Sequence, residues 1–339
     1  MFQAFPFSQY WQLYLGFIGF LLLIITVDLG VFHKKAHAVT MKEATAWSFI
    51  WLLIALAFNY WLYQYSLTKF SLNPELLIGS EKTAEALSQQ IALEFLTGYV
   101  VEKSLAIDNI FVFVVIFNYF AIPAAFQHRI LFYGILGAIL FRGIFIGLGS
   151  VLLQYHWILV LFGVFLIATG IKLCFAPEKE HDLSKNLVLK LLNKIIPISL
   201  KADRFKFFIR ENKRTLATPL FICLLMIEIS DVVFAVDSVP AIFAITKEPF
   251  IVFTSNMMAL LGLRSLYFLL AGAVDLFHLL KYGLGIVLIF VGLKMVWLHD
   301  LFDGKFPIVY SLSFIALVIG GSMLLSLLFP KKNGHPSAL

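Results

Sequence analysis

Two acidic residues, Asp231 and Asp237, lie inside an apolar stretch of the chain that is long enough to cross a lipid bilayer as a helix. The stretch runs from about Leu216 to Ile245, and Glu228 adds a third carboxylate one helical turn before Asp231. An acidic residue at the centre of a spanning helix costs about 2.5 to 3.5 kcal/mol on insertion scales, so its presence needs a reason beyond packing. We expect these carboxylates to bind a cation.

A second stretch of the chain repeats this pattern. It begins at Glu102 and reads E-K-S-L-A-I-D-N-I-F-V-F, whereas the stretch that begins at Ser230 reads S-D-V-V-F-A-V-D-S-V-P-A-I-F. The repeat places a second set of polar oxygens inside a predicted span. The aligned pairs are Glu102 with Asp231, Asp108 with Asp237, and Asn109 with Ser238.

The correspondence continues downstream of both motifs. Arg142, in F-R-G, matches Arg264, in L-R-S, and each arginine is followed 30 residues later by a lysine, Lys172 or Lys294. These lysines end the segments G-V-F-L-I-A-T-G-I-K and G-I-V-L-I-F-V-G-L-K. We interpret the pattern as an internal duplication.

Composition places the chain among integral membrane proteins. Apolar residues make up 61% of it and charged residues 14%, against roughly half and a quarter in soluble proteins. Nine stretches are long enough to cross about 30 Å of hydrocarbon, which predicts an all-α polytopic membrane protein with about nine transmembrane helices. They are residues 11–31, 46–66, 91–118, 130–152, 157–175, 216–246, 251–272, 281–298 and 307–329.

The duplication divides these spans into two repeats. Residues 91–175 form the first three-helix repeat and residues 216–298 the second, with a basic cytoplasmic loop at 176–215 between them. Residues 1–90 hold two N-terminal spans and an outer connection, and residues 299–339 hold the final span and a cytoplasmic tail. Three spans are an odd number, so the second copy must enter the membrane in the opposite orientation. This predicts an inverted 3+3 repeat with a substrate site at the interface between the copies.

Basic residues in the connections predict the orientation of the chain. With nine spans, 17 lysines and arginines lie in connections on one face of the membrane and four on the other. Lys and Arg are retained on the cytoplasmic side, so we expect the N-terminus outside and the C-terminus in the cytoplasm. We interpret the formal net charge of +6 as a signal of topology and of contact with the lipid bilayer, rather than of nucleic-acid binding.

The expected ligands are oxygen atoms. None of the eight histidines lies well inside a predicted span, and Cys174 and Cys223 are far apart in the sequence. Carboxylate, amide and hydroxyl oxygens suit manganese, magnesium or calcium, so we expect a hard divalent cation. Without that cation, Asp108 and Asp237 should approach each other closely enough that at least one takes up a proton, which would couple metal and proton binding.

The two arginines, Arg142 and Arg264, have two interpretations. They neutralise the carboxylates after the cation has left, or they are fixed structural partners that face Glu102 and Asp231 and hold the helices together. We favour the first interpretation.

Three further polar residues are weaker candidates for the site. Asp28 is close to the cytoplasmic end of the first span, where it could equally cap its helix. Glu94 lies in the third span, and Asn256 lies at the outer start of the seventh, where it could offer further oxygens. Gly134 takes the place of Asn256 in the first repeat, which gives that candidate no support.

The chain resembles the TerC/Alx family of bacterial membrane proteins from the first span to about Phe329. The resemblance rests on the motifs E-K-S-L-A-I-D-N-I-F-V-F, I-E-I-S-D-V-V-F-A-V-D-S-V-P-A-I-F-A-I-T and F-T-S-N-M-M-A-L-L-G-L-R-S-L-Y-F-L. It implies manganese export that protects against metal excess, an association with tellurite resistance, a place in the bacterial inner membrane, and kinship with LysE-type transporters. It also implies that the metal ligands are Glu102, Asp108, Asp231 and Asp237.

Three classes of function compete. The leading hypothesis is a secondary transporter that exports Mn²⁺ in exchange for protons. The second is a membrane-embedded accessory protein that binds metal in tellurite or metal stress without moving it. An intramembrane enzyme is disfavoured because the chain has no recognisable nucleophile motif, and an ATP-driven pump because it has no G-x-x-x-x-G-K-[ST] loop.

Overall fold

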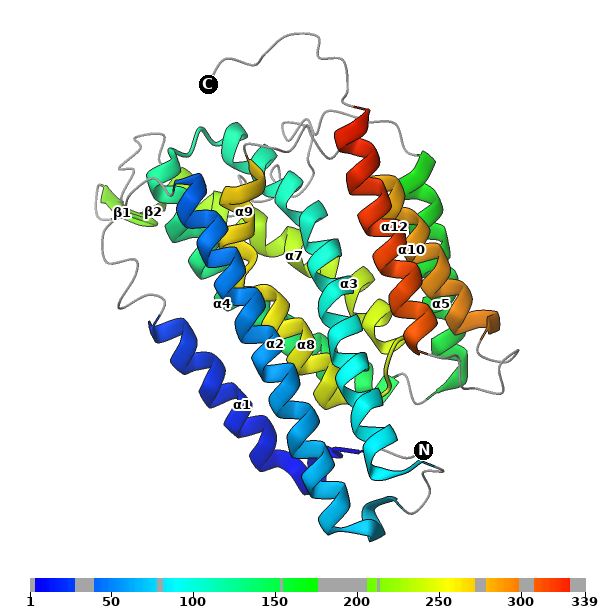
Figure 1. Ribbon diagram of the computed structural model, residues 1–339. Helices are drawn as coiled ribbons and strands as arrows, with labels where there is room; N and C mark the ends of the chain where they lie inside the picture. The colour runs from blue at the N-terminus through cyan, green and yellow to red at the C-terminus, as the bar shows by residue number, and fades with distance from the viewer. Residues whose placement is uncertain are drawn as a thin grey trace.

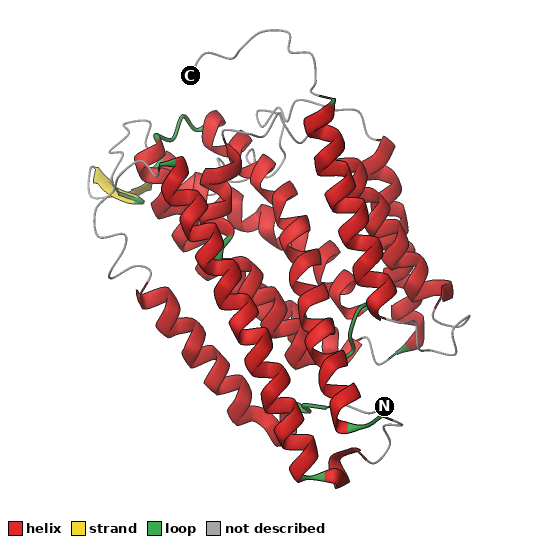
Figure 2. Cartoon of the chain, viewed as in Figure 1, coloured by secondary structure: helices red, strands yellow, loops and turns green. Residues whose placement is uncertain are grey.

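The computed structural model of the 339-residue chain describes residues 4–27, 40–77, 82–152, 155–175, 206–211, 214–271, 279–298 and 308–329. Most of this part of the chain is helical (Figure 2). The elements are α1 (Phe7–Val27), α2 (Met41–Leu72), η2 (Pro74–Leu77), α3 (Ala84–Tyr119), α4 (Ala124–Leu152), α5 (His156–Phe175), β1 (Phe208–Glu211), β2 (Arg214–Ala217), α7 (Pro219–Phe243), α8 (Pro249–Leu261), α9 (Leu263–Ala271), α10 (Leu280–Leu293), η5 (Lys294–Leu298) and α12 (Ile308–Leu328).

Each of the nine predicted spans overlaps one helix or one pair of helices. Among the described residues, five helices are long and apolar enough to cross a membrane, or six if the bent pair α8 and α9 counts as one span. Large apolar side chains such as Leu317 (75% exposed) and Leu148 (57% exposed) point outward from these helices. In hydrocarbon only a helix or closed barrel satisfies its own backbone hydrogen bonds, so this pattern is that of a multi-pass membrane protein.

The helices form one bundle in which α3 is central (Figure 1). It packs against α2, α7, α8 and α12, and α4 packs against α7 and α8 on another side. The helices α5, α10 and α12 lie side by side as a separate layer, whereas α1 lies at the opposite edge beside α2 (Figure 1). The polar motifs of α3 and α7 therefore meet inside the bundle.

Among the described helices that could together form one span, the pair α8 and α9 is sharply bent, at an angle of 45° at Gly262. The sequence had indicated a kink beside Asp237 and Ser238 instead, because Pro240 lacks a backbone donor. In the structure α7 runs unbroken from Pro219 to Phe243. Pro240 lies in its last turn, where the loss of one hydrogen bond does not interrupt the helix.

Glycines bring α5 and α10 into close antiparallel contact. A Cβ atom added at Gly170 would lie 2.5 Å from the backbone oxygen of Gly285, and one added at Gly292 would lie 2.6 Å from the backbone oxygen of Gly163. Real side chains do not approach a backbone oxygen this closely, so glycine is required at both crossing points. These four residues lie in the two segments that the duplication aligns.

Outside the bundle, β1 and β2 form an antiparallel hairpin in which Phe208 pairs with Ala217. The sequence analysis does not predict these strands. It predicted an amphipathic helix between Leu187 and Ile198, which lies outside the described residues.

Candidate cation-binding site

The guanidinium of Arg142, on α4, lies at the centre of a group of buried polar side chains. Its Nε and Nη2 atoms donate to the two carboxylate oxygens of Asp231, on α7, at 3.2 and 3.1 Å. Its Nη1 atom donates to Oε1 of Glu102, on α3. One arginine thus pairs with both of the acids that the duplication aligns, and its contact with Asp231 is bidentate.

Two neutral side chains complete this group. Asn256, on α8, donates from Nδ2 to Oε2 of Glu102 at 3.0 Å, and its Oδ1 accepts a hydrogen bond from Arg142 at 3.2 Å. Ser238, on α7, accepts from Arg142 at 3.3 Å. All members are at most 2% exposed. We call the group the polar site; it consists of Glu102, Arg142, Asp231, Ser238 and Asn256.

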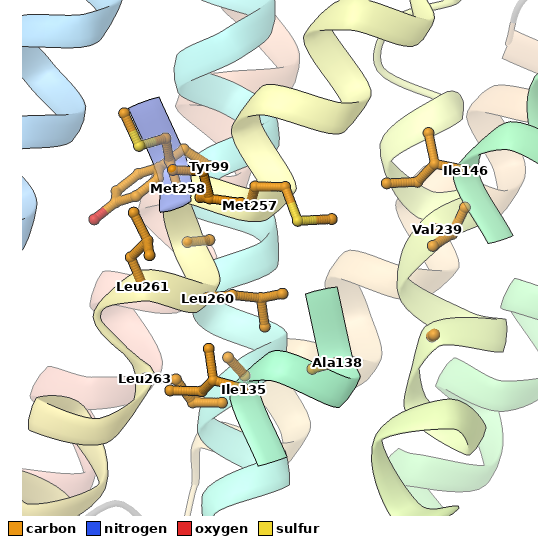
Figure 3. Close-up of a cluster of buried hydrophobic side chains, with 14 of the residues drawn as sticks. Tyr99, Ile135, Ala138, Ile146, Val239, Met257, Met258, Leu260, Leu261 and Leu263 are labelled. Atoms are coloured by element: carbon orange, nitrogen blue, oxygen red, sulfur yellow. The ribbon is translucent and has the colours of Figure 1, made fainter. Parts of the chain in front are cut away.

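Four helices hold the polar site, and each member lies well inside its helix. Apolar side chains of α4, α8 and α9 surround it; Figure 3 shows Ile135 beside Leu263 in this layer. Burying two carboxylates and a guanidinium away from water costs several kcal/mol per ion unless hydrogen bonds compensate. Here every polar contact of the arginine is to a site oxygen, which provides that compensation.

Glu228 lies one turn before Asp231 on α7 but outside the hydrogen-bonded group. Its Oε2 atom is buried and has no hydrogen-bond partner within the described part of the chain. A Cβ atom at Gly137, on α4, would collide with this carboxylate, so a larger residue there would require the Glu228 side chain to move. Glu228 is thus a partly buried acid with a buried, unused oxygen, one helical turn from Asp231.

A small cavity of about 10 Å³, on the scale of one water molecule, adjoins Asp231. Gly134 and Arg264 also line it. The Nη1 atom of Arg264 lies 3.3 Å from Nε2 of His128, and its guanidinium lies 5.8 Å from the centre of the Phe132 ring. These two contacts of Arg264 are with an imidazole and an aromatic ring, whereas Arg142 pairs with two carboxylates.

Lys103 is a buried basic residue that the sequence interpretation did not include. Its Nζ atom donates to the backbone oxygen of Ala259 at 2.9 Å, in the last turn of α8 before the break at Gly262. A broken helix leaves carbonyl groups without partners, and these need a donor inside a membrane. Successive residues of α3 thus hold α8 at two points, because Glu102 binds Asn256. The sequence feature that could have identified Lys103 is its charge, which lies in the middle of a predicted span directly after Glu102.

Glu94 belongs to a second polar group, near the connection between α7 and α8. The hydroxyl of Thr246 donates to its carboxylate and accepts from the backbone N–H of Glu248 at 3.2 Å. Glu94 lies eight residues before Glu102, or about 12 Å along α3. Between the two groups α3 and α8 touch, since a Cβ atom at Gly98 would lie 2.7 Å from the hydroxyl of Ser255.

The structure leaves some predicted ligands undescribed. Asp28 lies outside the described residues, and so do the side chains of Asp108 and Asp237, although their backbones belong to α3 and α7. Asn109 is buried at 2% exposure on α3, and the hydrogen bonds that form the polar site do not include it. The metal assignment of these residues stays a prediction.

The donor set of the polar site fits a hard cation, since it offers carboxylate, amide and hydroxyl oxygens and no sulfur or imidazole. In this arrangement, however, Arg142 stands between the two carboxylates. Across the described ranges, no three His, Cys, Asp or Glu side chains are arranged to hold a metal ion. The guanidinium takes the position that a bound cation would need.

Comparison with known proteins identifies the family. The model of the integral membrane protein TerC family matches residues 87–334, which include both repeats. The chain belongs to the TerC family. A relative from Myxococcus xanthus, the uncharacterized membrane protein STKORF319, is 46% identical over 327 residues, which cover 96% of this chain and 95% of the relative.

Two further TerC relatives carry different names. A protein of Escherichia coli K12 with the provisional name membrane-bound redox modulator Alx is 46% identical over 285 residues, covering 83% of this chain and 84% of the relative. An uncharacterized membrane protein of Rickettsia bellii is 38% identical over 284 residues, which cover 84% of this chain and 87% of the relative. No solved structure matches the chain.

Proposed function

We propose that this TerC protein is a secondary transporter that exports Mn²⁺, or another hard divalent cation, from the cytoplasm. The observation that carries the proposal is the polar site itself. Two carboxylates, an amide and a hydroxyl converge on one buried cationic group at the middle of four helices. Ionisable residues placed so deep in a membrane protein typically mark an ion pathway.

In this proposal Arg142 is an internal substitute for the transported ion. Its guanidinium neutralises Glu102 and Asp231 while the site holds no metal, and it must withdraw before a metal can bind the same oxygens. A cation that binds only the rearranged site shifts the protein toward that arrangement, which is the basis of a transport cycle. Glu228, whose Oε2 is unused, is close enough to Asp231 in sequence to join the ligand set.

The paired glycines of α5 and α10 support an inverted repeat. The alignment matches Gly163 with Gly285 and Gly170 with Gly292. Gly170 meets Gly285 and Gly292 meets Gly163, so exchanging the two copies turns one contact into the other. A two-fold relation between the copies produces this pattern, and it is the architecture in which the halves of a transporter alternate around a fixed site.

The cavity beside Asp231 supports an exchange of arginines during the cycle. By the alignment, the residues Asp231, Arg264 and Gly134 that line it correspond to Glu102, Arg142 and Asn256 of the polar site. We infer that Asp231 pairs with Arg142 in one state and with Arg264 in the other. Gly134 has no side chain where Asn256 has an amide, which leaves space for Arg264 to approach.

Flux measurements on purified protein in liposomes test the proposal. Mn²⁺ should leave the loaded side in the wild type, and Asp231→Asn should abolish this flux, because it removes one of the two ligand charges. Glu75→Gln, at an exposed position on η2, should transport like the wild type. A flux in Asp231→Asn equal to that of the wild type would contradict the site.

Proton exchange is the second part of the proposal, and it gives a separate test. Metal and protons compete for the same carboxylates, so an acidic exterior should displace the metal there and return protons inward. Export should therefore accelerate when the exterior is acidified at fixed membrane potential. A rate that is indifferent to reversal of the pH gradient would leave a uniporter or channel.

The alternative is an accessory protein that binds metal without transporting it. The name redox modulator belongs to the Escherichia coli relative. The two cysteines here, Cys174 and Cys223, are both free. Mn²⁺ binding by the purified protein without any flux would favour the accessory role.

We propose that the protein lies in the bacterial inner membrane. Its N-terminus would be outside, because most basic residues in the connections lie on the opposite face. A reporter inserted at Lys247 should then be external, and one inserted in the 176–205 segment should be cytoplasmic. The opposite result would invert the direction of the proposed export.

A further inference from the structure

A polar pocket of about 520 Å³ lies between the first turns of α1 and the last turns of α2, away from the polar site. Three side-chain amides, two phenols and one ammonium line it, together with two leucines, and no carboxylate of a described residue does. The lining residues are Gln9, Tyr10, Gln12, Leu13, Tyr65, Lys69, Asn73 and Leu76. It is therefore rich in hydrogen-bond donors and carries one positive charge.

Lys69 supplies that charge. Its Nζ atom lies 5.9 Å from the centre of the Tyr10 ring, and no hydrogen bond or ion pair joins this ammonium to another described residue. Asn73 donates from both its backbone N–H and its side-chain amide to the backbone oxygen of Lys69, at 3.1 and 2.8 Å, which leaves the amide oxygen and one amide hydrogen free. The pocket thus presents unused donors to a ligand with several acceptor oxygens.

Exposed aromatic side chains in neighbouring turns of α1 and α2 indicate how deep in the membrane the pocket lies. Trp11 on α1 is 48% exposed, and Tyr60 and Trp61 on α2 are 66% and 44% exposed. Exposed Trp and Tyr side chains gather at the level of the lipid headgroups. The pocket begins within the first two turns of α1, which places it at the same level, at an end of the bundle.

The attachment of α1 indicates why a ligand belongs here. Only Phe17, Leu21 and Ile25 of this helix are buried, and the ring of Phe17 lies 5.2 Å from that of Phe58 on α2. The ring of Phe20 also stacks on that of Phe58, at 6.2 Å, and the pocket lies nearer the start of α1 than these ring contacts. α1 lies at the edge of the bundle (Figure 1), where lipid reaches it.

We propose that this pocket binds the phosphodiester of a phospholipid headgroup, with Lys69 as the counter-charge and the amides and phenols as donors. Leu13 and Leu76 would contact the glycerol and the first carbons of the acyl chains. Basic residues beside interfacial aromatic rings are the usual surroundings of such phosphates. The lipid would fill the space between the start of α1 and the end of α2.

Lipid titration of the delipidated full-length protein tests this site. Phosphatidylglycerol should raise the unfolding temperature, and native mass spectrometry should show a retained lipid. In Lys69→Gln its apparent affinity should fall about fivefold, the contribution typical of one basic residue at an anionic lipid surface. Lys42→Gln, an exposed position at the other end of α2, should bind like the wild type. Gln12→Leu should also weaken binding by removing a donor.

Two further ligands separate the possible sources of the effect. Diacylglycerol, which lacks phosphate, and inorganic phosphate, which lacks acyl chains, should each stabilise the protein much less than phosphatidylglycerol. Equal stabilisation by diacylglycerol would show that only the chains are bound, and equal stabilisation by inorganic phosphate would show a site for a soluble anion. Either result, or unchanged lipid affinity in Lys69→Gln, would overturn the proposal without bearing on metal transport.

Discussion

At the scale of single residues, the two arginines that the duplication aligns make different contacts. Arg142 binds both Glu102 and Asp231, whereas Arg264 lies against His128 and Phe132. Because the guanidinium of Arg142 lies between these two carboxylates, we infer that it must move before a cation can bind both of them.

Replacing Arg142 should destabilise the protein strongly. Arg142→Gln leaves two buried carboxylates without their cation, and removing one partner of a buried ion pair typically costs about 3–5 kcal/mol. The unfolding temperature of the purified protein should fall accordingly. Adding Glu102→Gln and Asp231→Asn removes the unpaired charges and should restore much of the loss. A triple variant as unstable as Arg142→Gln would show that packing, and not charge, explains the effect.

The sequence could predict which residues carry charge in the membrane but not which of them meet. Aligning the repeats selected Glu102, Asp231 and Ser238, and the structure brings these three together around Arg142. Asn256 was a weak candidate because its repeat counterpart is Gly134, yet it binds Glu102 directly. Such contacts depend on how helices are rotated against each other, which the order of residues along one helix does not encode.

At the scale of elements, each predicted span overlaps a helix or a pair of helices, because length and apolarity are properties of a local stretch. Among the described residues, five of these helices, or six with the pair α8 and α9, are long and apolar enough to cross a membrane, and not nine. The break in the chain was predicted at the wrong place for a similar reason. Proline is a local signal, but Pro240 falls where α7 is about to end. The observed bend at Gly262 is instead supported by Lys103, which donates to Ala259 from a helix about 160 residues away in sequence.

The contact between α5 and α10 gives a prediction about close packing. In Gly170→Ala the new methyl group would lie 2.5 Å from the backbone oxygen of Gly285, which cannot move aside as a side chain could. Overpacking of this kind typically costs about 1–3 kcal/mol, so the unfolding temperature should fall. Gly147→Ala is the matched control, since nothing lies within 4 Å of its added methyl. Equal stability of both variants would contradict the contact.

At the scale of the whole molecule, the start of the chain is fixed to its second half. The carboxylate of Glu248 accepts hydrogen bonds from the backbone N–H groups of Ala4 and Phe5, at 2.6 and 3.3 Å. Phe5 is fully buried, with its ring 5.7 Å from that of Phe250 on α8. No local pattern announces a contact between residues more than 240 positions apart, so the sequence did not predict it.

This attachment gives a prediction about pH. Burial raises the pKa of Glu248, in the connection between α7 and α8, from 4.5 to about 7; the N–H of Ala4 opposes that rise, the nearby Glu94 carboxylate adds to it, and the N–H of Phe5 opposes it. Lys247 and Tyr14 are the other titratable groups near it. Because the pKa in the folded protein lies above the unfolded value, the stabilising contribution of this group is complete below about pH 4.5 and is lost as the pH rises through about 7.

The unfolding temperature of the wild type should therefore decline between pH 5 and pH 8 by more than that of Glu248→Gln, whose amide cannot titrate. The unfolding temperature of the variant should rise relative to that of the wild type as the pH increases, because only the wild type must bury a charge in that range. Glu75→Gln, at an exposed position, should follow the wild-type curve and so separates this group from acids at the surface. Parallel curves for the wild type and Glu248→Gln would mean that Glu248 carries the same charge throughout. The attachment of the N-terminal segment would then be independent of pH.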